Sequence, residues 1–218
     1  MLSRVRKTQT LGRMRSGPYE SIQRALLHAR FGIWTIALTY GLSVSAGLLM
    51  VHSSNRFALE YRDKLVGRAQ HESPILRQHQ RGNSVRAAGL DTAGNAVAGL
   101  LSMMAGYCVP AGYGVAAYRG WIGGIVSVDA AHRSRFVSLY GAFYYVVTLI
   151  LQLVPYSLAG GAGVSAGVAA FAVDNRTGYQ GRRIPWLRIP YEAIGDAGRI
   201  YLISLPLFAV ASLFEWVM

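Results

Sequence analysis

Five histidines and one cysteine are the side chains of this 218-residue chain best suited to bind a metal or to act as nucleophiles. Cys108 is the single cysteine, so the chain can form neither an intrachain disulfide nor a cysteine-based zinc site. The histidines lack HExxH or an equivalent spacing, and we therefore expect no metal site. They are His28, His52, His71, His79 and His132.

The sequence also lacks the signatures of soluble enzymes. It contains no P-loop, no G-x-S-x-G, no C-x-x-C and no segment of paired carboxylates. The clustered glycines of residues 112–120 do not follow a strand, which argues against dinucleotide binding. We therefore expect a protein that is not an enzyme and has no cofactor, although a pigment, quinone or lipid held between helices would need no signature residue.

The composition argues against a soluble fold. Hydrophobic residues make up 52% of the chain and charged residues only 15%, whereas soluble domains carry about 25% charged residues. The 22 Lys and Arg outnumber the 10 Asp and Glu, which gives a formal charge of +12. In a membrane protein such an excess favours anionic lipid headgroups and oriented loops.

Long uncharged stretches predict an all-α, polytopic transmembrane helical bundle of about five spans. The stretch 31–51 is long enough for one span, and 92–118 for one span that bends near Pro110. The 38 residues of 136–173, with Pro155 near their centre, indicate a helical hairpin, or one helix followed by a re-entrant segment. The stretch 200–214 predicts a short last span, and 120–128 a re-entrant or interfacial piece.

Basic residues orient these spans. Residues 1–30 carry seven Lys and Arg, which predicts a cytoplasmic N-terminus in a bacterial inner membrane. The stretch 31–51 is longer than a signal-peptide core and indicates a retained signal anchor. With a hairpin at 136–173, segments 119–135 and 174–199 also face the cytoplasm, which puts 15 basic residues inside and seven outside. The C-terminus is then outside.

Segment 52–91 is the predicted extracytoplasmic loop between the anchor at 31–51 and a membrane core at 92–218. Its polar part has apolar residues at spacings of three and four, typical of an amphipathic helix, with a break at Pro74. Such a helix lies on the membrane surface or against a partner, and a solvated loop helix fits the pattern equally well.

Within the predicted spans we expect no charged residue, which argues against proton-coupled transport. Small residues at four-residue spacing are abundant instead and favour close helix packing. Packing inside the bundle is favoured over contacts between subunits. The residues concerned are Ala159, Gly163 and Gly167, then Gly120 with Gly124, and Ser43 with Gly47.

The segment 182–199 is predicted to enter the last span along the anionic lipid surface. Its basic and aromatic side chains are typical of headgroup anchors, and we favour this role over contact with a nucleic acid. The candidate anchors are Arg182, Arg183, Trp186 and Arg188.

Three stretches resemble the stage II sporulation protein M family of integral membrane proteins. They are the glycine-spaced segment 94–124, LVPYSLAGGAGVSAG at 153–167, and RIYLISLPLFAVASLFEWV at 199–217. The resemblance covers roughly residues 90–218. The sequence departs from the family at Arg119-Gly120, where the family has Asn-Gly, and at Gln152, which stands at or near a usual Glu. The resemblance implies a membrane scaffold for peptidoglycan hydrolases rather than a reaction.

Together these features predict a non-enzymatic subunit or scaffold of a larger bacterial membrane complex. Its expected partners are other membrane protein subunits, anionic lipids and a second copy of the chain. The alternative is the permease subunit of a transport system driven by a separate ATPase, with breaks at Pro110 and Pro155 beside a midplane site.

Overall fold

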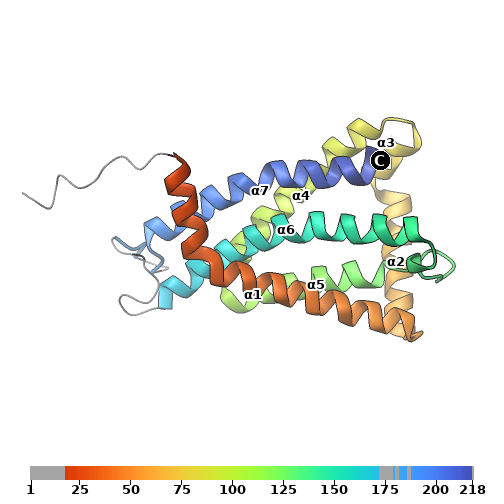
Figure 1. Ribbon diagram of the computed structural model, residues 1–218, viewed down its shortest axis with the longest axis horizontal. Coiled ribbons are helices and arrows are strands. Elements are labelled where there is room, and N and C mark those ends of the chain that lie inside the picture. Colours follow the sequence, from red (N-terminus) through yellow and green to blue (C-terminus); the bar gives the residue numbers. More distant parts are fainter. Residues whose placement is uncertain (1–17, 172–178, 180–181, 186–187, 218) are drawn as a thin grey trace, which may run out of the picture.

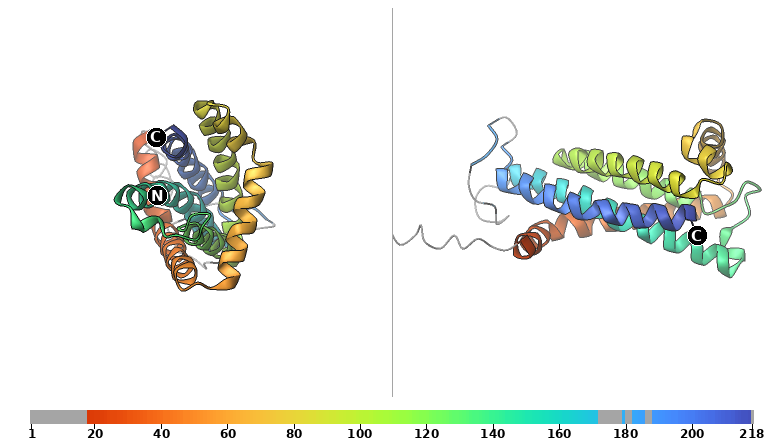
Figure 2. Two further views of the ribbon diagram at one scale, coloured as in Figure 1. Left: turned by 90° about the vertical axis from the view of Figure 1, so that its right-hand side faces the viewer. Right: turned by 90° about the horizontal axis from the view of Figure 1, so that it is seen from above.

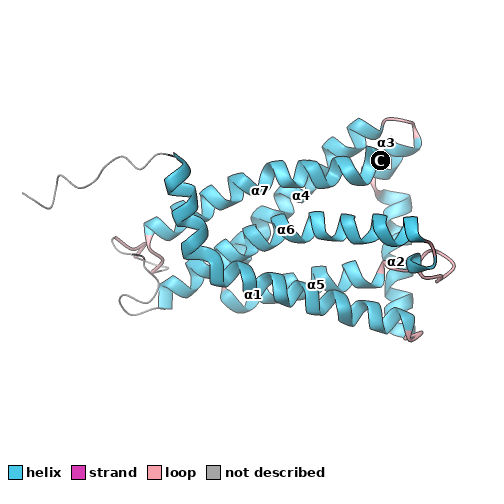
Figure 3. Ribbon diagram, in the orientation of Figure 1, coloured by secondary structure: helices cyan, strands magenta, loops and turns pink. Residues whose placement is uncertain are grey.

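The computed structural model describes residues 18–171, 179, 182–185 and 188–217, and these residues contain helices but no β-strand (Figures 1 and 3). The predicted all-α fold class is confirmed. The helices are α1 (Pro18–His52), α2 (Arg56–Glu72), α3 (Pro74–Gln80), α4 (Ser84–Tyr107), α5 (Val109–Ile125), the 3₁₀ turn η1 (Arg135–Val137), α6 (Leu139–Phe171) and α7 (Tyr191–Val217).

Three helices of the described chain, α1, α6 and α7, are long and apolar enough to cross a membrane, so the protein is membrane-embedded. The central helix of the bundle is α6, which contacts α1, α4, α5 and α7. Of the two other long helices, α4 carries Arg86 and Asp91, and α5 has 17 residues, a length of about 26 Å. Three helices thus have spanning character and α4 and α5 pack beside them, while the prediction of about five spans stays a prediction.

The predicted hairpin at 136–173 is wrong, because α6 is one helix of 33 residues. Pro155 lies within it, fully buried among neighbouring helices. A proline removes one helical hydrogen bond, but packed neighbours and small local adjustments allow membrane helices to continue through it. The chain therefore passes once through this segment, with no re-entrant piece in 139–171.

The reversal occurs earlier, between α4 and α5, where the sequence predicted one bent span. The chain turns at Cys108, and Pro110 sits in the first turn of α5, where its missing N–H costs nothing. A Cβ on Gly112 would lie 2.8 Å from the Cα of Gly106. Glycine at both positions lets the two helices fold back closely against each other.

This reversal changes which segments share an end of the bundle. We call the end where α2 and α3 lie the cap end; α5 also ends there and α6 begins there, while α6 ends and α7 begins at the opposite end (Figure 1). Segment 119–135 therefore lies on the same side as segment 52–91. The prediction that segment 119–135 lies on the same side as the N-terminus is therefore wrong. The count of 15 basic residues inside against seven outside depended on that prediction and no longer holds.

At the cap end, α2 runs across the bundle rather than along it (Figures 1 and 2). The side chain of Asn55 caps α2 by accepting from the Ala58 N–H at 3.1 Å. Ser73 ends α2 and caps α3, with Pro74 in the first turn of α3. The predicted amphipathic segment with a break at Pro74 thus forms two short surface helices.

Candidate functional site

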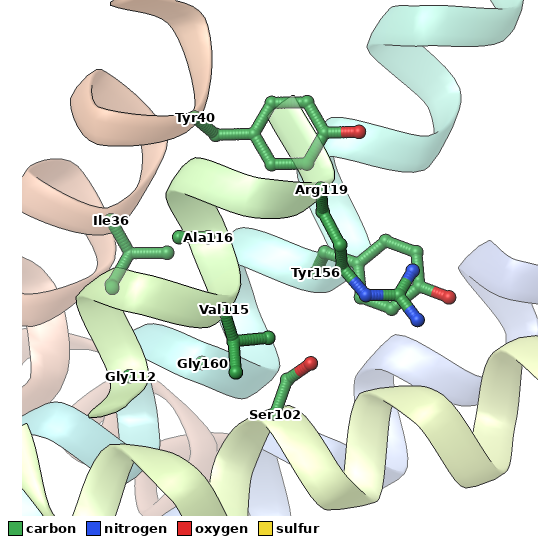
Figure 4. A pocket seen from close by; sticks show the side chains of 9 residues that line it. All are labelled: Ile36, Tyr40, Ser102, Gly112, Val115, Ala116, Arg119, Tyr156 and Gly160. Atoms are coloured by element: carbon green, nitrogen blue, oxygen red, sulfur yellow. The ribbon is translucent and has the colours of Figure 1, made fainter. Parts of the chain in front are cut away.

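A charged side chain lies inside the bundle at Arg119 of α5. Its guanidinium carbon is 3.9 Å from the centre of the Tyr156 ring of α6, and Figure 4 shows the two side chains stacked. Tyr156 is buried. A cation over an aromatic face recovers part of the free energy that the charge loses on leaving water. Arg119 was expected in a loop, and the fold places it within a helix.

The Tyr156 hydroxyl extends this contact into a chain of hydrogen bonds across three helices. It donates to Asn95 Oδ1 of α4 at 2.7 Å. Asn95 Nδ2 donates to Asp91 Oδ2 at 2.9 Å, and Ser212 Oγ of α7 donates to the same oxygen at 2.7 Å. We call these five residues, from Arg119 to Ser212, the polar network.

A second acid follows along α7 at Glu215. Its Oε2 accepts from Gln152 Nε2 at 2.7 Å, and its backbone carbonyl accepts from the Tyr144 hydroxyl at 2.6 Å. The prediction of a charge-free bundle is therefore wrong. The uncharged stretches were bounded by charged residues, whereas the helices continue through those residues and carry them into helix contacts.

A small cavity adjoins Arg119 and Tyr156. Its volume is about 10 Å³, and Figure 4 shows its walls from α1, α4, α5 and α6. Tyr40 and Ser102 contribute its other polar groups. This volume is close to the minimum that holds one water molecule, so the cavity is too small for an organic substrate.

A larger cavity lies beneath α2 and α3 at the cap end, and we call it the cap cavity. Its volume is about 420 Å³, within the size range of small-molecule sites. Residues of α2, α3, α5, η1, α6 and α7 line it. Its charged lining residues are Arg62, Arg135 and Glu215.

Arg62 links α2 to the floor of the cap end. Its side chain is 94% buried; Nη1 donates to Asp63 Oδ1 at 2.8 Å and Nη2 to the Val128 carbonyl at 3.2 Å. Its Nε has no hydrogen-bond partner in the described part of the chain. The hydrogen bond from Arg62 lowers the pKa of Asp63, and His132 lowers that pKa further.

A separate ionic cluster lies at the opposite end of the bundle. The buried Asp196 of α7 lies 2.9 Å from His28 Nδ1 of α1 and accepts from Arg199 Nη1 at 2.6 Å. Tyr179 packs edge-on against His28, and burial raises the pKa of its phenol. These contacts join the start of α1 to the start of α7.

The predicted small-residue positions lie in contacts between helices of this chain. A Cβ on Gly163 would overlap the carbonyl of Met103, and one on Gly167 would lie 2.7 Å from the carbonyl of Gly106. Ala159 is fully buried in the same helix. The stripe of α6 therefore faces α4 and the core.

The two other stripes face each other between α1 and α5. Cβ atoms on Gly120 and Gly124 would overlap the carbonyls of Tyr40 and Val44. Ser43 and Gly47 lie opposite them; the Ser43 Cβ is 3.0 Å from the Cβ position of Gly120, and the Gly124 Cα is 3.0 Å from that of Gly47. These small residues therefore pack one helix of the chain against another.

The four predicted headgroup anchors fall in the connection between α6 and α7. Arg182 and Arg188 are exposed. Arg183 donates to the carbonyl of Ala169 at 3.2 Å, which caps the end of α6 as basic side chains often do at helix C-termini. Trp186 lies outside the described residues.

The histidines are dispersed over the fold. The described residues contain no group of three His, Cys, Asp or Glu that could hold a metal ion. His52 Nε2 lies 2.8 Å from Ser134 Oγ, and His132 Nε2 lies 2.9 Å from Asp63 Oδ2. Both contacts fasten the loop after α5 to the end of α1 and to α2.

Sequence reasoning missed Arg62, Asp91, Arg119 and Arg135 as site residues. One signal was present: Asp91 and Asn95 are four residues apart and so lie on one face of a helix. No local sequence pattern predicts that Arg62 shares a cavity with Arg135 and Glu215, because this depends on how α2 crosses the bundle.

Comparisons with known proteins give no family assignment. No protein-family model matches this sequence, and no curated protein or solved structure is significantly similar to it.

Proposed function

We propose that this protein is a non-enzymatic, integral subunit or scaffold of a larger assembly in the bacterial inner membrane, with its N-terminus in the cytoplasm. One observation carries the proposal: α2 lies across the cap end with cationic side chains exposed. Lys64 and Arg68 are exposed and lie one helical turn apart. Neither of them forms an ion pair with another described residue.

The inner face of α2 is fixed to the bundle. Ala58 is fully buried in a cluster with Val51 and Ile125. Phe57 stacks on Trp121 with ring centres 5.9 Å apart. A helix held in this way offers its outer face without the entropic cost of ordering a loose segment, which favours protein docking.

The partner that suits this face is a protein with an acidic surface at the same membrane boundary. Complementary charges steer association and select partners. The stripes of small residues on α1, α5 and α6 are occupied by contacts within the chain, so the cap end is a better candidate for the interface. The resemblance of residues 90–218 to the stage II sporulation protein M family agrees with a scaffold role.

The proposal is tested by gentle detergent extraction from native membranes with an N-terminal tag, followed by quantitative mass spectrometry. We expect one or more partner proteins in stoichiometric amount. A protein that is extracted alone, in detergents that preserve other complexes of the same membrane, would contradict the scaffold role.

The second candidate is a permease subunit driven by a separate ATPase. The polar network favours it, because charged residues within membrane helices are costly and often mark transport paths. Under this alternative a nucleotide-binding ATPase is the sole partner. Substituting Asp91 by Asn should then abolish transport while the ATPase still co-purifies.

A further inference from the structure

We propose that the cap cavity binds the headgroup of a phospholipid that carries both a phosphodiester and a primary ammonium group, as phosphatidylethanolamine does. The phosphodiester lies at Arg62 and Arg135, and the ammonium lies at Glu215. This site is independent of the partner-docking face on α2.

The first argument is the unsatisfied donor of Arg62. Its side chain is 94% buried and lines the cavity. Its Nε has no partner among the described residues and almost no exposed surface, so the side chain must turn slightly for a phosphate to reach it. A buried donor left without an acceptor is costly. Phosphate oxygens are suitable acceptors for guanidinium groups, and Arg135 supplies a second guanidinium on the same cavity.

The second argument is the acid in the same cavity. Glu215 comes from α7, a different wall from α2 and η1, and accepts one hydrogen bond from Gln152. A purely anionic headgroup would bring a negative charge towards this carboxylate. An ammonium group would instead pair with it, so the lining fits a headgroup with charges of both signs.

The third argument is the remaining lining and the position of the cavity. Apolar side chains, including Val66, Leu76 and Leu149, lie beside Tyr144 and Tyr145, a mixture that suits the boundary between headgroup and acyl chain. The volume of about 420 Å³ accommodates a headgroup rather than a whole lipid. Residues of α2 form part of the cavity wall, and α2 crosses the end of the membrane helices (Figure 2).

The test uses the full chain, stripped of lipid in detergent, and native mass spectrometry with phosphatidylethanolamine or phosphatidylglycerol of identical acyl chains. We expect one phosphatidylethanolamine to bind about tenfold more tightly than phosphatidylglycerol, because one charged hydrogen bond distinguishes them. Equal binding of the two lipids would overturn the proposal. So would displacement by millimolar inorganic phosphate, which would indicate a site for the free anion.

Variants assign the two halves of the headgroup. Glu215→Gln should remove the preference for phosphatidylethanolamine, and Arg135→Gln should weaken both lipids about tenfold. Arg62→Met should also weaken the binding of both lipids. If Arg62→Met fails to fold, Arg135→Gln still tests the phosphate contact. Arg56→Gln is the matched control on α2, exposed and outside the cavity lining. A preference unchanged in Glu215→Gln would contradict the ammonium contact.

Discussion

The guanidinium of Arg119 lies on the face of the Tyr156 ring, 3.9 Å from its centre. It forms no ion pair with another described residue. The same tyrosine donates its hydroxyl to Asn95. The Tyr156 side chain therefore contacts a cation on α5 through its ring and an amide on α4 through its hydroxyl. The two contributions can be separated by substitution.

Replacing Tyr156 by Phe should remove the hydrogen bond and keep the cation–π contact. We expect a loss of about 1–2 kcal/mol in the free energy of unfolding, because a buried acceptor on Asn95 is left unsatisfied. Tyr156→Leu should lose at least a further 0.5–2 kcal/mol, roughly the value of the cation–π contact, because it also removes the edge-on contact of the ring with Phe208. Denaturant titration in detergent measures both differences.

The matched control is Tyr201→Phe on α7, which removes a hydrogen bond to the Ala96 carbonyl of α4, the residue next to Asn95, and leaves the Arg119 contact in place. Its loss should resemble that of Tyr156→Phe. Equal stabilities of Tyr156→Phe and Tyr156→Leu would contradict a contribution of the Arg119 contact.

Gly163 should tolerate no side chain. An added Cβ would overlap the Met103 carbonyl, so Gly163→Ala must push α6 away from α4. We expect a large drop in the monodisperse fraction recovered by size-exclusion chromatography. Gly114→Ala, whose Cβ would enter open space on α5, should leave that fraction unchanged. Equal recovery of the two variants would show that the α4–α6 approach is not as close as described.

Asp63 should make stability depend on pH at the acidic end. Its pKa is lowered in the folded chain, chiefly by the Arg62 hydrogen bond. Its contribution is therefore fully present above the unfolded pKa of about 3.9. It is lost as the pH falls through the folded pKa. Because the pair is exposed on one side, we expect less than about 1 kcal/mol.

The measurement compares the unfolding midpoint of the wild-type chain with that of Asp63→Asn from pH 7 downward. The difference should be constant at neutral pH and shrink to zero on acidification. A difference that grows as the pH falls would mean that the protonated acid, rather than the carboxylate, is the stabilising form.

The reversal at Cys108 predicts which loops share a side of the membrane. In a Cys108→Ser background, cysteines introduced by Gln80→Cys on α3 and Ala131→Cys in the loop after α5 should react with a membrane-impermeant maleimide from the same side. Pro185→Cys, between α6 and α7, should react only from the other side. Labelling of Gln80→Cys and Ala131→Cys from opposite sides would restore the sequence-based topology.

The sequence predicts the helical class and the surface helices well, because both depend on local patterns. Long apolar runs specify α1, α6 and α7, and the amphipathic spacing around Pro74 specifies α2 and α3. The number of passes depends on where the chain reverses, and proline alone does not decide that. Pro155 stays within a helix, whereas the turn at Cys108 follows from the small residues that flank it.

The candidate site is predicted less well for a physical reason. Uncharged runs underestimate helix length, so Asp91, Arg119 and Glu215 were assigned to loops or membrane boundaries although each is paired within the bundle. Arg62 and Arg135 meet at one cavity through tertiary packing, for which a single sequence carries no periodic signal.

The most direct test of the scaffold proposal is partner retention by the exposed basic face of α2. We compare the wild-type chain with Lys64→Glu/Arg68→Glu by quantitative mass spectrometry after gentle extraction, with Arg81→Glu/Arg86→Glu as the control of equal charge change at the same end. We expect at least a tenfold loss of the stoichiometric partner in the first double variant, with the partner retained in the control. Full retention in Lys64→Glu/Arg68→Glu would contradict docking through α2.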